Sequence, residues 1–422
     1  MKFRLHHVAL ATLVALGLTS LGAHAQSATP AAPASAASAP TNTLRDVVRV
    51  PLAEAQKLFE ANNHAAAREK LQTVQALADK TAYESYVTAR IALSVALAQD
   101  DGPGAAQLAD SIFQLNATGN WLKPQETVSL MHAVGIAHYR AKDYGGAARW
   151  LDRTAEAGST EASVRDARIS SHLLAGNVQR GTELLAQSID AAEKAGQTPE
   201  QKQLQLLYQA RNQLKDAAGA TQAIESLVRY YPSKEHWRQV LNRLWARADL
   251  PNRLQLDVFR LALYTQALDE ATDFSEYVDF AQRAGFMVEA LKVFDQGAAM
   301  GLIGTTDAHK KLRAKLAQDV EADRKSFKAD LASAQKKPDG FALFNLGLNL
   351  VANQQFELGL DLLEKAITKG IAKNPIDAKL RLAAAYAQAG QSDKALQALS
   401  AVSGSEGIDE LARYWKWALR KP

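Results

Sequence analysis

Residues 134–151 have the sequence VGIAHYRAKDYGGAARWL, which joins two amphipathic segments through a polar turn at Lys142 and Asp143. Gly135 on the first segment is followed twelve positions later by Ala147 and sixteen positions later by Leu151. Packed helices lie about 8–10 Å apart, and small residues at their crossing permit that approach while large residues fill the flanks. The stretch therefore predicts a hairpin of two antiparallel helices.

The same spacing recurs along the chain, which predicts a repeat array rather than separate globular domains. The pattern consists of two small residues twelve positions apart and a large apolar residue four positions after the second. It recurs at Ala55-Ala67-Leu71, Gly347-Gly359-Leu363 and Ala383-Ala395-Leu399. Looser copies are Ile169-Gly181-Leu185, Tyr208-Ala220-Ile224 and Val278-Ala290-Phe294. Apolar residues recur every three or four positions, as in amphipathic helices. The spacing predicts hairpins that begin near residues 48, 87, 128, 162, 201, 235, 271, 305, 340 and 376.

This pattern resembles the tetratricopeptide repeat, a helix-turn-helix unit of about 34 residues. The resemblance is carried by Val134 to Tyr139 with Asp143, Tyr144 and Ala147, and by Leu346-Gly347 through Leu363, Lys365 and Ala366. It implies an all-α fold, a right-handed superhelical solenoid of about ten helical hairpins. It also implies a chain that binds other proteins.

The N-terminal segment has the features of a cleaved export signal. Lys2 and Arg4 precede an uncharged apolar run over residues 8–21, and Ala23-His24-Ala25 matches a small-x-small cleavage site. The run is shorter than the ~20 residues that a bilayer span needs, and an uncleaved anchor is the alternative. The chain has no cysteine to carry a lipid. We expect a periplasmic protein that is not a lipoprotein, with export from a eukaryotic cell left open.

The sequence predicts six segments along the chain. They are a signal peptide over 1–25, a flexible Ala/Pro/Ser-rich linker over 26–43, an N-terminal tetratricopeptide-like array over 44–234, divergent helical repeats over 235–337, C-terminal repeats over 338–404 and a capping helix over 405–422. The middle segment diverges because the second helix of the unit near 235 lacks the small residue and because residues 305–337 are rich in charged residues. Those charged residues form either one long helix or a hairpin. In the capping helix, Ile408, Leu411, Ala412, Trp415 and Leu419 share one apolar face.

Composition and motifs argue against several functional classes. The formal net charge is +4, of which Lys2 and Arg4 contribute two, and no concentrated basic face for nucleic acid is evident. The lack of cysteine excludes thiolate catalysis and cysteine-ligated metals. No HExxH, GxSxG, Walker or GxGxxG motif is present. His132 and His138 are six positions apart, which is the wrong spacing for a metal pair on a helix. We expect no enzyme activity, cofactor or metal.

Three further features have competing interpretations. Glu225-Ser226 matches the catalytic Glu-Ser pair of some peptidoglycan lytic transglycosylases, but an exposed structural glutamate is the interpretation that its place within a repeat favours. The basic cluster from Lys310 to Lys315 suits an acidic partner or anionic lipid, whereas the acidic residues that follow favour a solvated face. Trp415 and Trp417 suit either a membrane surface or a cap with a basic tail.

A partner-binding surface is expected on the first helix of each hairpin, as the resemblance implies. The resemblance places Ser129, His132, Ile136, Tyr139 and Arg140 of one unit on this surface, together with Lys202, Gln205, Gln209 and Asn212 of another. The second set is polar along one stripe, and its amides suit pairing with an extended peptide backbone; a wet face without a ligand is the alternative. The stripe near 340, formed by Phe341, Phe344, Leu348 and Val351, is instead apolar, as in a hydrophobic groove or a buried contact.

The string Tyr230-Tyr231-Pro232-Ser233-Lys234-Glu235-His236-Trp237 resembles a junction in periplasmic tetratricopeptide proteins encoded beside TonB-ExbB-ExbD systems. This resemblance covers about residues 200–400 and implies an accessory role in energised outer-membrane transport. We therefore expect an exported periplasmic adaptor with a protein or peptide partner in the cell envelope, no membrane segment after signal cleavage and no small-molecule cofactor. The alternatives are a scaffold for envelope or polysaccharide assembly and a peptidoglycan-acting enzyme on a helical scaffold.

Overall fold

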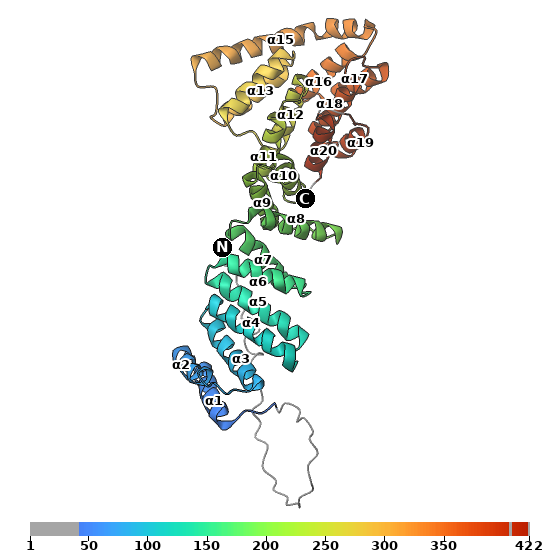
Figure 1. The fold of residues 1–422 in the computed structure, drawn as a ribbon. Coiled ribbons are helices and arrows are strands. Elements are labelled where there is room, and N and C mark those ends of the chain that lie inside the picture. Colours follow the sequence, from blue (N-terminus) through green and yellow to red (C-terminus); the bar gives the residue numbers. More distant parts are fainter. Residues whose placement is uncertain (1–41, 405–406, 421–422) are drawn as a thin grey trace, which may run out of the picture. The chain divides into compact units, whose positions relative to one another are not determined.

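The computed structural model describes residues 42–404 and 407–420, which form helices α1 to α20 and contain no strand (Figure 1). The predicted all-α fold of repeated helical hairpins is confirmed. The expected signal peptide and nearly all of the expected linker lie outside the described residues. The chain divides into two compact units, residues 1–190 (unit 1) and 191–422 (unit 2), and each is described by itself.

Unit 1 is a row of helical hairpins. Its helices are α1 (Asp46–Glu60), α2 (His64–Gln75), α3 (Ala82–Ala98), α4 (Gly102–Gly119), α5 (Pro124–Arg140), α6 (Tyr144–Glu156), α7 (Ala162–Leu174) and α8 (Val178–Lys194), the last of which runs across the division between the units. Each of α1, α3 and α5 packs on the helix that follows it, and α3 also contacts α1 and α5. The core therefore runs continuously from one hairpin to the next, as in a repeat array.

The hairpin turns share one backbone conformation. Lys142 adopts the left-handed conformation (φ 62°), which lets the Asp143 amide donate to the His138 carbonyl at 2.9 Å and close α5. Asp143 then begins α6, since its carboxylate accepts a 2.9 Å hydrogen bond from the Gly146 amide. A left-handed residue followed by a capping aspartate recurs at 100–101 and 215–216. The polar turn expected at 142–143 is confirmed.

The small residues that define the sequence repeat lie where paired helices touch. A Cβ atom added to Gly135 would lie 2.8 Å from Leu151 Cγ, and one added to Gly347 would lie 2.8 Å from Leu363 Cγ. Ala55 and Ala67, at the same positions of the first hairpin, are fully buried. The predicted close crossing is confirmed, because any larger side chain at these positions would force the helices apart.

Unit 2 begins with hairpins and ends with helices that return to them. Its helices are α9 (Gln201–Gln213), α10 (Ala217–Tyr230), α11 (Lys234–Trp245), α12 (Asn252–Tyr264), α13 (Ala271–Arg283), α14 (Met287–Ala299), α15 (Asp307–Lys336), α16 (Phe341–Ala352), α17 (Phe356–Lys369), α18 (Pro375–Gln388), α19 (Ser392–Ser400) and α20 (Ile408–Leu419). The pairs α9/α10, α13/α14, α16/α17 and α18/α19 form hairpins.

The later helices of unit 2 pack on its earlier ones. Helix α12 contacts both α18 and α20 (Figure 1). Helix α14 contacts α16. Arg381 on α18 donates to the Asp257 carboxylate on α12 at 2.8 Å, across 124 positions of sequence. In an open repeat array each unit meets only its neighbours. Unit 2 therefore adds long-range contacts to its repeated hairpins, and these contacts involve helices of the 235–337 segment that the sequence predicts to be divergent.

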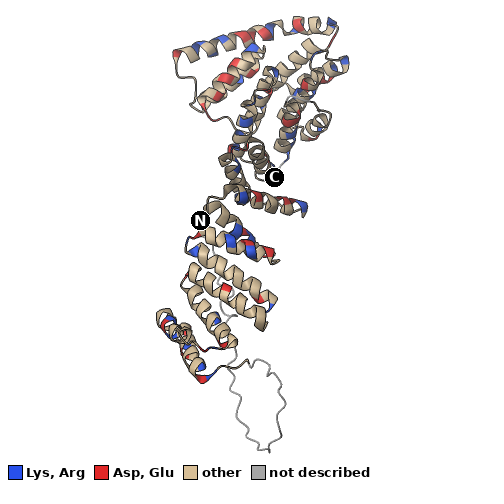
Figure 2. Ribbon diagram, viewed as in Figure 1, with Lys and Arg blue, Asp and Glu red and all other residues tan. Residues whose placement is uncertain are grey.

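The charged residues 307–336 form the single helix α15, which settles the choice between a long helix and a hairpin. Only Leu316 and Ala334 are buried along it, and basic and acidic residues alternate on its surface (Figure 2). Lys315 pairs with Asp319 at 2.6 Å, and Arg313 pairs with Asp295 at 2.6 Å. The solvated-face interpretation of the basic cluster agrees with these exposed pairs.

Helix α20 closes unit 2 with the apolar face that the sequence predicts. Its five predicted face residues are all buried, and Trp415 is 1% exposed. The Trp415 ring lies 5.0 Å from that of Tyr264 on α12, and the Tyr414 ring lies 6.4 Å from that of Trp237 on α11. The helix therefore covers α11 and α12 rather than only the preceding hairpin.

An ion pair fastens α1 to α3 in unit 1 and makes its stability depend on pH. The Arg45 guanidinium donates to both carboxylate oxygens of buried Glu84, at 2.9 and 2.8 Å. These hydrogen bonds lower the pKa of Glu84 from its ordinary 4.5 to about 2. A lowered folded-state pKa adds stability that is present above pH 4.5 and is lost as the pH falls toward 2.

We expect Glu84→Gln to lower the melting temperature of unit 1 at pH 7, because it removes the charge that Arg45 faces. The difference from the native protein should shrink between pH 4.5 and 2, where native Glu84 becomes protonated. Hydrogen exchange of the α1 and α3 amides across this window provides the measurement. A difference that stays constant from pH 7 to pH 2 would show that the ion pair does not stabilise this contact.

Candidate functional site

The stripe expected on α5 is only partly open to solvent. Ser129 and Arg140 are exposed, whereas His132, Ile136 and Tyr139 are half-buried. All five lie on α5.

Neighbouring helices hold several of these α5 side chains. The Tyr139 ring packs edge-on against Tyr144 at 5.4 Å, and Arg140 lies 3.5 Å from the Asp100 carboxylate. His132 lies 3.8 Å from the Glu161 carboxylate, and burial lowers the pKa of its imidazole. The α5 stripe is therefore a mixed surface whose polar groups are largely engaged within the chain.

The stripe expected on α9 has more unused hydrogen-bonding capacity. Lys202, Gln209 and Asn212 are exposed and Gln205 is half-buried. Within the described residues, Lys202, Gln205 and Gln209 have no side-chain hydrogen bond or ion pair. Their donors and acceptors are free to meet another molecule.

Asn212 at the end of this stripe is already paired. Its amide nitrogen donates to the Tyr208 carbonyl at 2.9 Å, and its amide oxygen accepts from Arg243 on α11. The same guanidinium lies 5.2 Å from the centre of the Tyr208 ring. Asn212 is therefore not free for a partner, and it connects the α9 stripe to Arg243.

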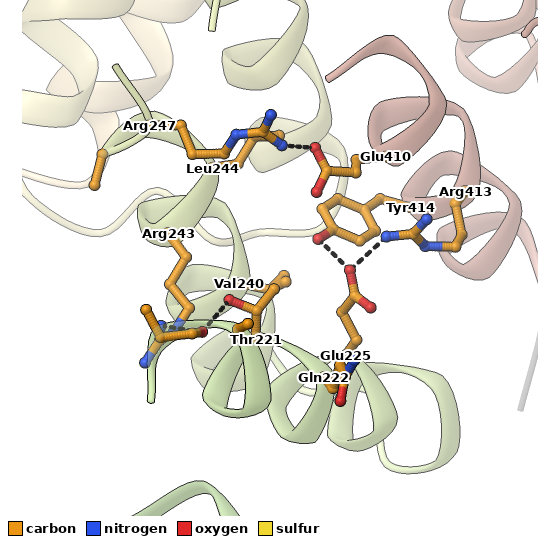
Figure 3. Close-up of a pocket in the computed structure, with 13 residues that line it drawn as sticks. Thr221, Gln222, Glu225, Val240, Arg243, Leu244, Arg247, Glu410, Arg413 and Tyr414 are labelled. Carbon is orange, nitrogen blue, oxygen red and sulfur yellow. Dashed lines mark hydrogen bonds and ion pairs between the residues drawn. The ribbon is translucent and has the colours of Figure 1, made fainter. Parts of the chain in front are cut away.

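Arg243 lines a pocket between α10, α11 and α20 that sequence reasoning did not find (Figure 3). The pocket encloses about 640 Å³, within the usual size range of small-ligand sites. Its apolar lining consists of Ala217, Ala218, Val240, Leu244 and Ala246. Arg243 on α11 and Arg247, two positions beyond the end of that helix, were the local signal available in the sequence. Of the two acidic partners of Arg247, Asp249 is local in sequence and Glu410 comes from α20.

Two glutamates of the pocket are paired with arginines (Figure 3). Glu225 accepts hydrogen bonds from Arg413 at 2.5 Å and from the Tyr414 hydroxyl at 2.7 Å. Glu410 accepts from Arg247. Burial, followed by the charge of Glu225, raises the pKa of Tyr414 well above its ordinary value, so the phenol stays protonated and donates.

Glu225, considered in the sequence as a glycan-cleaving acid, thus joins α10 to α20. Its side chain is 17% exposed rather than fully exposed, which corrects the expected solvent-facing position. Both of its partners are on α20, 188 and 189 positions away in sequence. These contacts explain Glu225 as a residue that links two helices distant in sequence.

The histidines have separate structural contacts. His138 is 3% exposed, and its Nδ1 atom lies 2.8 Å from the Asp143 carboxylate at the α5–α6 turn. Among residues 42–404 and 407–420 no group of three or more potential ligands is arranged to hold a metal. In the same residues no helix is long and apolar enough to cross a bilayer.

The junction string at 230–237 packs between helices. The Tyr231 hydroxyl donates to the Pro199 carbonyl at 2.8 Å, and Ser233 caps α11 through a 3.1 Å hydrogen bond from the His236 amide. Trp237 is 4% exposed. Of the apolar stripe near 340, Phe344, Leu348 and Val351 are buried, whereas Phe341 is 46% exposed. That stripe is therefore mainly a packing contact.

No family model and no curated protein matches this chain. Among solved structures, the TPR2AB domain of yeast Sti1 in its pHSP90 complex aligns at 13% identity, covering 70% of this chain and 100% of that chain, with a TM-score of 0.23. Yeast Tom70 aligns at 11% identity over 88% and 95%, with a TM-score of 0.23. The P58(IPK) TPR domain aligns at 12% identity over 88% and 97%, with a TM-score of 0.21. The assignment of fold rests on the hairpins themselves, not on these distant likenesses.

Proposed function

We propose that this chain is an adaptor that binds extended segments of partner proteins and acts by binding rather than by catalysis. The observation that carries the proposal is the row of Lys202, Gln205 and Gln209 on α9. Within the described chain, their polar groups have no side-chain partner. A polar stripe of this kind on a rigid helix can hydrogen-bond to a peptide backbone.

The spacing of the row suits an extended chain. With a rise of 1.5 Å per helical residue, Lys202 and Gln209 lie about 10 Å apart along α9. An extended peptide advances about 3.3 Å per residue, so the row spans about three residues of a partner. Side-chain amides both donate and accept, which matches the alternating carbonyl and amide groups of a backbone.

The compartment and pathway are finer parts of the proposal. The leader over 1–25 supports export to the periplasm through a cleaved signal. The junction at 230–237 supports an accessory role beside a TonB-type outer-membrane transport system, although its contacts within the fold account for the same residues. An envelope protein is accordingly the proposed partner.

The test is affinity capture from membranes with the native chain and a Gln205→Ala/Gln209→Ala variant. Each lost hydrogen bond weakens binding by about 0.5–1.5 kcal/mol, so the pair should reduce affinity for the captured protein roughly tenfold. The matched control is Gln179→Ala/Gln187→Ala, which removes two exposed amides from the second helix α8. Equal capture by the α9 variant and the native chain would refute the proposed surface.

A further inference from the structure

We propose that the pocket between α10, α11 and α20 receives an acidic side chain of the partner segment that lies on α9. The inference rests on the proposed function and names the chemistry of the partner. Four features carry it: an arginine without a counter-ion, the acidic partners of the other two arginines, the apolar walls and the link to α9.

Arg243 is a cation that the described chain does not neutralise. Its two terminal nitrogens bond only to neutral acceptors, the Asn212 amide oxygen and, at 3.4 Å, the Ala217 carbonyl. Its Nε atom is buried and has no hydrogen-bond partner in the described structure. A buried donor without an acceptor is costly, and a carboxylate is the acceptor that a guanidinium binds best.

The other two arginines of the pocket have acidic partners. Arg247 bonds to Glu410 and, at 2.6 Å, to Asp249, and Arg413 bonds to Glu225. Of the three arginines that line the pocket, only Arg243 has no acidic partner within the described chain. One carboxylate would supply that partner. The glutamates would repel a dianion more strongly, which favours a carboxylate over a phosphate group.

The apolar walls of the pocket indicate which kind of side chain would lie next to the bound carboxylate. Val240 and Leu244 present buried apolar surface beside Arg243, and Ala217, Ala218 and Ala246 add further apolar lining. A pocket of about 640 Å³ has room for more than one carboxylate-bearing side chain. An aliphatic residue next to the acidic one would fill the remaining space and remove apolar surface from water.

The pocket continues the α9 stripe. Asn212, the last residue of the expected stripe, bonds to the same guanidinium that lines the pocket. A segment that follows Lys202, Gln205 and Gln209 along α9 would therefore reach Arg243 next. The free amides would bind its backbone, and the pocket would select its side chain.

The test uses the full chain and two blocked peptides, acetyl-Ala-Glu-Leu-amide and acetyl-Ala-Gln-Leu-amide. We expect the Glu peptide to bind at least about fivefold more tightly and to shift the NMR signal of the Arg243 Nε–H group. The preference should disappear in Arg243→Gln and persist in Arg229→Gln, which removes an exposed arginine from α10 without touching the pocket. Because Arg243 also holds the α9–α10 turn, thermal unfolding and an Arg243→Lys variant separate loss of charge from loss of fold.

Equal affinity for the two peptides, or no binding at millimolar concentration, would overturn the inference. Tighter binding of inorganic phosphate than of the Glu peptide would also overturn it. Both the peptide and the phosphate affinities are measured on the native protein, so these outcomes do not depend on whether a variant folds. If membrane capture depends on Gln205 and Gln209 while the peptides bind equally, only the pocket assignment fails. If the Glu peptide binds selectively but no partner is captured through α9, the proposed function fails instead.

Discussion

Replacing Trp415 by alanine is expected to destabilise unit 2 by about 3–5 kcal/mol. The indole is 1% exposed, and its ring packs against Tyr264 of α12 at 5.0 Å. Its removal leaves a cavity between α20 and α12, and the loss is largest where neighbours cannot collapse into the space. Hydrogen exchange should show faster opening of α20 and α12, with unit 1 unchanged.

Trp417 provides the matched control on the same helix. It is only half-buried, so Trp417→Ala should cost roughly 1 kcal/mol. Both variants are compared by denaturant unfolding together with exchange of the α20 amides. Equal effects of the two substitutions would show that α20 does not pack against α12 through Trp415.

Replacing Asp257 by alanine is the second large effect, again about 3–5 kcal/mol. Asp257 is 2% exposed and accepts hydrogen bonds from Arg260 at 2.9 Å and from Arg381 at 2.8 Å. Its loss leaves the Arg381 guanidinium without its counter-charge and leaves buried Arg260 with Glu289 as its remaining acidic partner. Since Arg381 is on α18, the contact between the early and late helices of unit 2 should weaken first.

The Asp279–Arg283 pair shows how much of this effect comes from burial. It is an ion pair on the exposed surface of α13, with the Asp279 side chain 50% exposed. Asp279→Ala should change stability by less than about 1 kcal/mol. If Asp257→Ala is equally mild in chemical denaturation, the buried network does not hold α18 against α12.

Local pattern predicted the hairpins because their causes lie close together in sequence. Gly135 and Leu151 are sixteen positions apart, and both the crossing and the turn at Lys142 and Asp143 are set within that stretch. The apolar face of α20 follows from helical periodicity alone. Its burial against α11 and α12 does not, because periodicity identifies a face but not its neighbour.

The return of the chain in unit 2 depends on contacts that no local pattern encodes. Asp257 meets Arg381 across 124 positions, and Glu225 meets Arg413 across 188. Charged residues are common on any helix surface, so nothing in the sequence distinguishes these from exposed ones. The pocket was missed for the same reason, since it forms only where α20 returns to α10 and α11.

The position of the α9 stripe could be predicted from the sequence, but the hydrogen bonding of its side chains could not. Helical spacing placed Lys202, Gln205, Gln209 and Asn212 on one face, and the structure keeps them there. Only the tertiary contacts show that Asn212 is bonded to Arg243 while the other three have no side-chain partner in the described chain. The difference matters, because a group that is already paired has less to offer a ligand.

The central claim is that α9 presents a surface to another protein, and site-specific photo-crosslinking in cells tests it most directly. A crosslinking residue at Gln209 on α9 is compared with one at Arg229, an exposed position on α10 of the same hairpin. We predict a discrete adduct with one envelope protein from Gln209 and none from Arg229. No adduct from Gln209, or the same adducts from both positions, would contradict the claim.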